Sequence, residues 1–152
     1  MKLSGSNSTE VAAPAEVCRD VLIDFDAYVD WFPGAHESRL VSGPGEPPAG
    51  HLRFSAVGVL PDVEFTMRYS SPAPDRLVPE IVEGALRISG PGWELSALSP
   101  DRTRVTYEVE LEMHVPGGFL AERALKGPAT RYLIEQPVDR LRERAESLAA
   151  SD

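Results

Sequence analysis

Residues 104–115 read RVTYEVELEMHV, and this stretch decides the fold class. Six apolar side chains alternate along it with polar ones: Val105, Tyr107, Val109, Leu111, Met113 and Val115. Because successive side chains of a strand point to opposite faces of a sheet, the alternation predicts a strand with one dry face and one wet face. Such strands are typical of antiparallel sheets, whose dry face must be covered by another layer.

Five earlier segments show the same period of two, near residues 37–42, 51–59, 62–70, 76–82 and 85–96. Short stretches rich in proline and glycine separate them, including residues 43–48 and 71–74. Tight turns between successive strands predict an antiparallel meander. A weak further strand is expected before Thr9, which makes seven strands in all.

Two short helices are expected between the first strand and the rest of the sheet. Pro14 and Glu16 suit the first turn of a helix. A second helical turn should hold Tyr28 and Trp31 before Pro33 ends it.

A long helix is expected over residues 119–148, where apolar side chains step by three and four. Its apolar stripe consists of Ile134, Val138, Leu141, Ala145 and Leu148, and continues backward through Thr130, Gly127 and Leu120. We expect this helix to lie on the dry face of the sheet, because the sequence offers no other helix long enough to cover it. Pro128 and Pro137 should bend or interrupt it.

The composition restricts the class of partner. The 152 residues include 15 Lys and Arg against 24 Asp and Glu, a formal net charge of −9. A negative charge spread along the chain repels phosphate, so we expect no nucleic-acid partner. No apolar run reaches the length of a membrane span, and Cys18 has no second cysteine to pair with. We expect one domain over residues 1–152, in the cytoplasm, without stable membrane insertion.

Four strings, in this order of elements, resemble a known superfamily over nearly the whole chain: APAEV (13–17), DFDAYVDWFPG (24–34), VEG (82–84) and TRVTYE (103–108). They are similar to the START/SRPBCC superfamily, in particular its polyketide cyclase/dehydrase and coenzyme Q-binding branch. The resemblance implies an α+β helix-grip fold, in which a curved seven-stranded antiparallel sheet wraps the long C-terminal helix. It also implies an elongated cavity for a hydrophobic ligand between sheet and helix.

The candidate lining of that cavity comes from the dry strand faces, the second short helix and the facing side of the long helix. It comprises Trp31, Phe32, Phe54, Phe65, Met67, Tyr69, Trp93, Tyr107, Val109, Leu111, Gly127, Thr130 and Ile134. Trp31 and Phe32 are expected to cap the core, with gating of ligand entry as the alternative. Large walls opposite the small Gly127 and Thr130 should leave room.

Tyr69 and Tyr107 are the candidate polar groups of the cavity, since a phenol offers an apolar wall and one hydroxyl. No sequence feature supplies a partner to tune a pKa that starts near 10, so an orienting hydroxyl is favoured over a catalytic one. His36, His51 and His114 lack the spacing of metal ligands, and no dinucleotide or phosphate-binding motif occurs. We therefore expect neither a metal nor a cofactor.

Two functions from different classes are indicated. The first is a carrier or binding protein for a neutral hydrophobic molecule such as a polyketide, quinone, isoprenoid or lipid. The alternative, which the resemblance implies, is a polyketide cyclase, aromatase or dehydratase in which Tyr69 or Tyr107 orients substrate carbonyls and an acyl carrier protein is a partner. The aromatase-type cyclases of this superfamily carry polar Ser and Arg on the strand that corresponds to residues 63–69, whereas the inward positions expected here are Val63, Phe65, Met67 and Tyr69. An interaction module whose cavity is filled by its own side chains is a third hypothesis.

Overall fold

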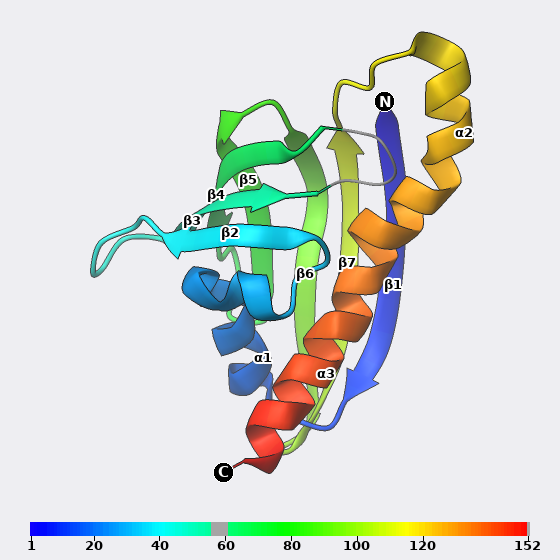
Figure 1. Ribbon diagram of the computed structural model, residues 1–152. Coiled ribbons are helices and arrows are strands. Elements are labelled where there is room, and N and C mark those ends of the chain that lie inside the picture. The colour runs from blue at the N-terminus through cyan, green and yellow to red at the C-terminus, as the bar shows by residue number, and fades with distance from the viewer. Residues whose placement is uncertain (56–60, 152) are drawn as a thin grey trace.

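The computed structural model describes residues 1–55 and 61–151, so residues 56–59 of the predicted strand 51–59 lie outside the described residues. The strands are β1 (Lys2–Val11), β2 (Ala35–Leu40), β3 (Ala49–Phe54), β4 (Val63–Ser70), β5 (Arg76–Gly84), β6 (Arg87–Ser99) and β7 (Arg102–Glu112). The helical elements are α1 (Ala15–Ile23), the 3-10 helix η1 (Phe25–Asp30), α2 (Gly118–Thr130), the π-helical turn η2 (Arg131–Glu135) and α3 (Gln136–Ala150). Figure 1 shows their arrangement.

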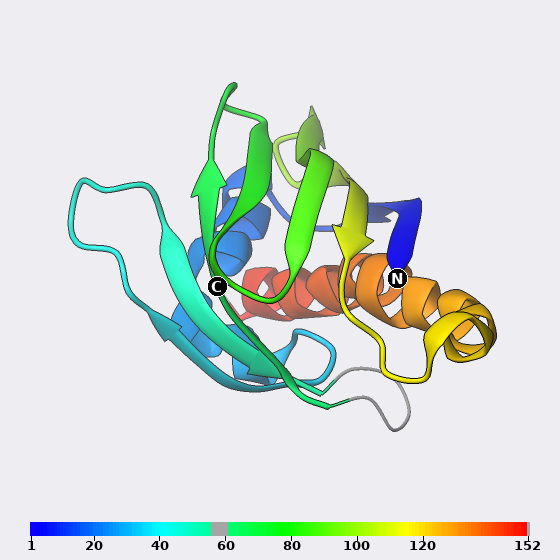
Figure 2. The same ribbon diagram turned by 90° about the horizontal axis from the view of Figure 1, so that it is seen from above.

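The strands form one antiparallel sheet in the order β1-β7-β6-β5-β4-β3-β2. The predicted meander is therefore confirmed from β2 to β7, and β1 is the edge strand beside β7. The β1–β7 pairing runs from Lys2 opposite Glu112 to Val11 opposite Thr103. Figure 2 shows the sheet curling around the C-terminal helical segment. This arrangement confirms the predicted α+β class and the wrapped helix.

The pairing between β5 and β6 is short, and we call the unpaired stretch beyond it the seam, made of residues 78–84 of β5 and 87–92 of β6. Only Arg76 and Leu77 of β5 pair with β6, opposite Glu94 and Trp93. Beyond that point β5 pairs only with β4, and β6 only with β7. Proline stands on both sides of the seam, at Pro79 and Pro91, and cannot donate a hydrogen bond to a ladder. The sheet thus consists of two halves joined at one end.

The C-terminal helical segment runs from Gly118 to Ala150, close to the predicted 119–148, but it contains the π-helical turn η2. Pro137 is the second residue after this turn, has no N–H to donate, and its ring crowds the carbonyl four residues before it. A π turn advances the chain by an extra residue and so rotates α2 relative to α3. The buried stripe therefore continues backward through Leu133 and Ala129 instead of through Gly127 and Leu120.

Several contacts join this helical segment to β1, among them a hydrogen bond from the Arg142 guanidinium to the Thr9 hydroxyl at 3.4 Å. A Cβ on Gly5 would lie 3.2 Å from Cγ2 of Thr130 and 3.6 Å from Cγ2 of Ile134, so a larger residue here would have to push the Thr130 methyl back by a few tenths of an ångström. The Asn7 side-chain amide donates to the carbonyl of Glu135, at 2.8 Å, and so pairs a carbonyl of the π turn. Among the described helices none combines the length and the apolar character needed to cross a membrane.

Candidate functional site

An apolar pocket lies inside the curved sheet and takes its walls from both halves of it. One wall comes from β3 and β4, the other from β6, β7 and the residues just before β6, and η1 with the residues directly after it and η2 contribute the rest. The lining consists of Tyr28, Phe32, Leu52, Phe54, Phe65, Met67, Tyr69, Leu86, Ile88, Trp93, Tyr107, Leu111 and Leu133. No residue of this lining carries a charged side chain.

Most of the residues predicted for the cavity meet in this pocket: Phe32, Phe54, Phe65, Met67, Tyr69, Trp93, Tyr107 and Leu111. All of them except Phe32, which follows η1, come from strands whose period-two pattern is clear in the sequence. Sequence reasoning missed Tyr28, Leu52, Leu86, Ile88 and Leu133. Alternation with Phe54 on the same strand was a usable signal for Leu52, whereas Leu133 reaches the pocket only because of the π turn.

The other predicted residues lie away from the pocket. Gly127 is exposed, with open space where a Cβ would stand, because the π turn rotates α2 out of the predicted phase. Thr130 and Ile134 contact β1 at Gly5, and Val109 is the residue paired with Gly5, so these side chains pack where the helix meets the sheet. Trp31 lines a separate surface groove together with Val17, Val21 and Arg144, among others.

The pocket is small, with a cavity volume of about 30 Å³. This is room for about two water molecules. Aromatic pairs fill the remaining space: Phe54 and Phe65 meet edge to face with ring centroids 5.7 Å apart, and Trp93 stacks on Tyr107 at 4.1 Å. Residues 1–55 and 61–151 therefore enclose no roomy cavity of the kind expected from the sequence, and a ligand larger than water requires the walls of this pocket to move apart.

Three phenols gather at one end of the pocket, and two of their protons have fixed partners. The Tyr28 hydroxyl lies 2.5 Å from the Leu22 carbonyl oxygen, which can only accept, so Tyr28 donates to it. The Tyr69 hydroxyl lies 3.0 Å from that of Tyr28. Since Tyr28 has a single proton and has already used it, Tyr69 donates to Tyr28. The chain Tyr69 to Tyr28 to Leu22 is thus directed.

Burial keeps these phenols neutral. It raises the pKa of Tyr69 to about 12 and the pKa of Tyr28 well above its ordinary value of 10. Burial, and after it the neighbouring Tyr69, also raises the pKa of Tyr107. At neutral pH all three groups are therefore hydrogen-bonding hydroxyls and not phenolate bases.

Tyr107 differs from the other two phenols because its hydroxyl makes no hydrogen bond to any residue that the structure describes. Within that part of the chain, Nε1 of Trp31 is the fully enclosed side-chain polar atom that lacks a partner. The Tyr107 oxygen is thus not among the fully enclosed atoms. The residue as a whole is only 5% exposed, and it lines the pocket. Since Tyr107 lines the cavity, that cavity is the space in which its hydroxyl can find a partner.

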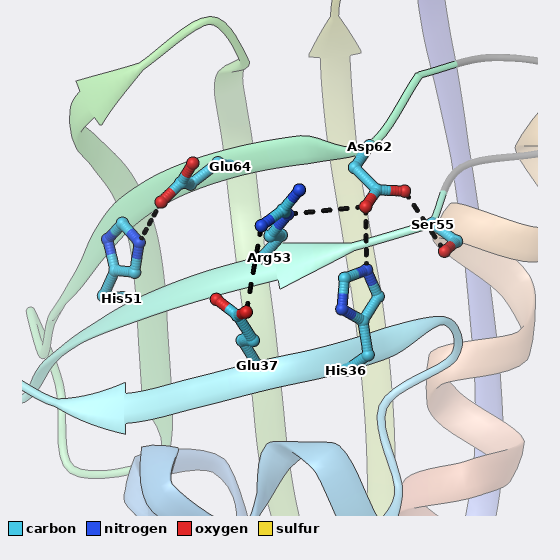
Figure 3. Close-up of polar contacts among 7 residues, drawn as sticks. All are labelled: His36, Glu37, His51, Arg53, Ser55, Asp62 and Glu64. Atoms are coloured by element: carbon cyan, nitrogen blue, oxygen red, sulfur yellow. Dashed lines mark hydrogen bonds and ion pairs between the residues drawn. The ribbon is translucent and has the colours of Figure 1, made fainter.

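A polar network covers the outer face of β2, β3 and β4, and Figure 3 shows its side chains. His36 Nε2 lies 3.1 Å from an Asp62 oxygen, and the Ser55 hydroxyl donates to the other Asp62 oxygen at 3.3 Å. Because the serine and the histidine both contact the aspartate and not each other, the histidine cannot take the serine proton as in a catalytic triad.

The other contacts of this network are the ion pairs of Arg53 and a hydrogen bond between His51 and Glu64. Arg53 lies 3.4 Å from Asp62 and 3.8 Å from Glu37, and His51 lies 2.7 Å from Glu64. His51 and Arg53 alternate along β3 with the pocket-lining Leu52 and Phe54, so the network and the pocket occupy opposite faces of the sheet. Within the described residues, no group of three potential ligand side chains is placed to hold a metal ion.

Both the sequence and the fold are similar to those of known proteins. Residues 2–146 match the model of a family described as polyketide cyclase/dehydrase and lipid transport. No curated protein matches the chain. Among solved structures, an aromatase/cyclase from Streptomyces sp. R1128 superposes with a TM-score of 0.76 at 19% identity, covering 96% of this chain and 94% of that one.

Two further solved structures show the same helix-grip fold. A START superfamily protein from Mycobacterium smegmatis gives a TM-score of 0.68 at 20% identity, over 97% of each chain. A STAR-related lipid transfer protein from Xanthomonas axonopodis gives 0.67 at 22% identity, over 91% of this chain and 82% of that one. At these identities the likeness establishes the fold, and the family match over residues 2–146 establishes the family.

Proposed function

The chain belongs to the polyketide cyclase/dehydrase and lipid transport family, and on that premise we propose that it binds a neutral hydrophobic small molecule in the pocket between β3–β4 and β6–β7, as a carrier or binding protein. The whole of residues 1–152 forms this ligand-binding domain, and its proposed compartment is the cytoplasm. The observation that carries the proposal is the lining itself, which is apolar except for the three phenols and the indole N–H of Trp93.

The lining favours a neutral ligand over a charged one. An ion placed in this pocket would lose its hydration and meet no opposite charge, since the lining carries none. Apolar surface, by contrast, gains about 25 cal/mol for each Å² removed from water. A polyketide, quinone, isoprenoid or lipid without a charged group at its buried end meets these conditions.

Ligand entry requires the pocket to widen, and the seam provides a way. The lining spans both halves of the sheet, with Phe65 and Met67 on one side and Trp93 and Tyr107 on the other. On this side of the pocket the halves are joined through the Arg76–Glu94 and Leu77–Trp93 pairs. Separating them along the seam breaks no backbone ladder bonds, because residues 78–84 and 87–92 are not paired with each other. It does break the hydrogen bond that the Arg76 guanidinium donates to the Pro91 carbonyl, at 3.0 Å. Met67 is flexible and adapts its shape to the ligand.

Carriage is favoured over catalysis by the state of the polar groups. General acid and base groups work best with pKa values near the operating pH, whereas burial raises the pKa of all three phenols of the lining. The alternative function, a polyketide cyclase, is supported by the solved Streptomyces relative, which is named an aromatase/cyclase. In that alternative Tyr69 and Tyr107 orient the carbonyls of a confined polyketide delivered by an acyl carrier protein, and the chemistry results from confinement.

Native mass spectrometry of the purified protein, with and without added hydrophobic probes, tests the proposal. We expect one neutral ligand or probe for each chain, bound by the wild type and by the outer-face control Arg68→Trp but lost in Met67→Trp. Recovery of the ligand unchanged after incubation supports carriage, and protein-dependent ring closure or loss of water from a reactive polyketide mimic supports the cyclase. Failure of the wild type to bind any hydrophobic probe contradicts the proposal.

A further inference from the structure

One of the three lining phenols has a proton without a partner among the described residues. The Tyr28 proton goes to the Leu22 carbonyl, and the Tyr69 proton goes to Tyr28. Tyr107 is therefore the lining phenol whose proton has no acceptor among the described residues. Since the side chain is buried, a ligand that fills the pocket also displaces any water from this hydroxyl.

The ligand group that takes the place of this water decides how well a ligand binds. A hydrocarbon placed against the Tyr107 hydroxyl would leave a buried donor without an acceptor, which is costly. A carbonyl oxygen in the same place accepts the proton and removes that cost. Tyr69 cannot replace it as a donor, because its own proton is held by Tyr28.

The walls next to Tyr107 indicate the shape of the group that carries the carbonyl. Trp93 stacks on Tyr107 with its ring inclined by 21°, and Phe54 and Phe65 form another aromatic wall of the same pocket. Flat conjugated rings pack well against such faces, and their in-plane carbonyl oxygen reaches a hydroxyl at the rim.

On the basis of the proposed function, we propose that Tyr107 determines ligand specificity by donating a hydrogen bond to a carbonyl oxygen, so that the pocket prefers planar conjugated ketones and quinones to hydrocarbons of the same shape. Tyr28 and Tyr69 form the fixed relay that leaves Tyr107 as the donor. The proposal assigns no bond-breaking step to any of them.

A matched pair of probes tests the inference, 9-fluorenone and fluorene, which share one ring skeleton and differ in the carbonyl. We expect the wild type to bind fluorenone about tenfold more tightly than fluorene, which corresponds to about 1.4 kcal/mol. In Tyr107→Phe this ratio should fall to near one, chiefly through weaker binding of fluorenone. Tyr132→Phe, which removes a phenol outside the pocket lining, should keep the wild-type ratio.

The outcomes separate this inference from the proposed function. If both probes bind the wild type equally, or if Tyr107→Phe keeps the tenfold ratio, the inference is wrong while ligand binding stands. If 9-fluorenol binds more tightly than fluorenone, the site selects an alcohol and the carbonyl preference is wrong. If neither probe binds, the proposed function fails and the inference fails with it. Melting curves of each variant check that it is folded.

Discussion

Replacing Met67 by tryptophan tests the position and the size of the pocket at once. Met67 is 7% exposed in the middle of β4, and its side chain borders a cavity of about 30 Å³. An indole has several more non-hydrogen atoms than the methionine side chain, and a space for about two water molecules cannot hold them. The large empty cavity expected from the sequence would accept the indole with little loss of stability. The observed cavity is too small to do so.

The expected magnitudes are those of overpacking. Inserting extra atoms into a filled interior costs about 1–3 kcal/mol, which for a chain of this length lowers the melting temperature by about 2–12 °C. The same indole occupies the space that a ligand would need, so the affinity for a hydrophobic probe should fall at least tenfold. Arg68→Trp places the same ring on the outer face and should change the stability by less than about 1 kcal/mol.

Thermal melts and probe titrations on the two variants give both quantities. The reasoning fails if Met67→Trp loses stability while its probe affinity equals that of the wild type, because Met67 would then pack in a core apart from the binding site. It fails equally if the variant is as stable as the wild type and binds the probe unchanged.

Three further outcomes are expected. Val138→Asp should lower the free energy of unfolding by several kcal/mol in urea titrations, because it buries an unpaired charge where the helix meets the sheet, and an unchanged midpoint would show that this face is not buried. Burial raises the pKa values of the phenols Tyr28, Tyr69 and Tyr107, so their contribution to stability is complete below pH 10 and is lost as the pH rises through the folded-state pKa, which is about 12 for Tyr69. Phenolate absorbance should therefore appear together with unfolding. Phenolate absorbance of these residues near pH 10 in folded protein would contradict their burial. In hydrogen exchange, amides of residues 78–84 and 87–92 that point into the seam should exchange faster than those of β7, and equal protection would mean that the halves of the sheet are joined throughout.

The strand alternation and the helical stripe were sufficient to predict the sheet, the meander and the covering helix. Local patterns determine these features, since period two and period 3.6 are read directly from neighbouring residues. The seam also had a sequence signal, because Pro79 and Pro91 stand inside predicted strands where a regular ladder needs N–H donors. We expected turns and uninterrupted strands there, and the incomplete pairing was missed.

The details of the site depended on geometry that no local pattern contains. The π turn before Pro137 changed which helix residues face inward, so Leu133 lines the pocket and Gly127 does not. The small volume of the pocket depends on how the rings of Phe54 and Phe65 meet, which is a property of side-chain packing. Tyr69 and Tyr107 were correctly placed on dry faces, but their different roles depend on Tyr28 and its bond to a backbone carbonyl.

Ligand binding in this pocket can be observed most directly at the methionine methyl groups. The chain has three methionines, Met1, Met67 and Met113, and Met67 is the one that lines the pocket. In the NMR spectrum of protein carrying 13C-methyl methionine, titration with 9-fluorenone should shift the Met67 methyl signal most strongly and give intermolecular contacts between that methyl and the probe. Saturable binding with the Met67 signal unchanged, or with the contacts at Met1 instead, would contradict the account.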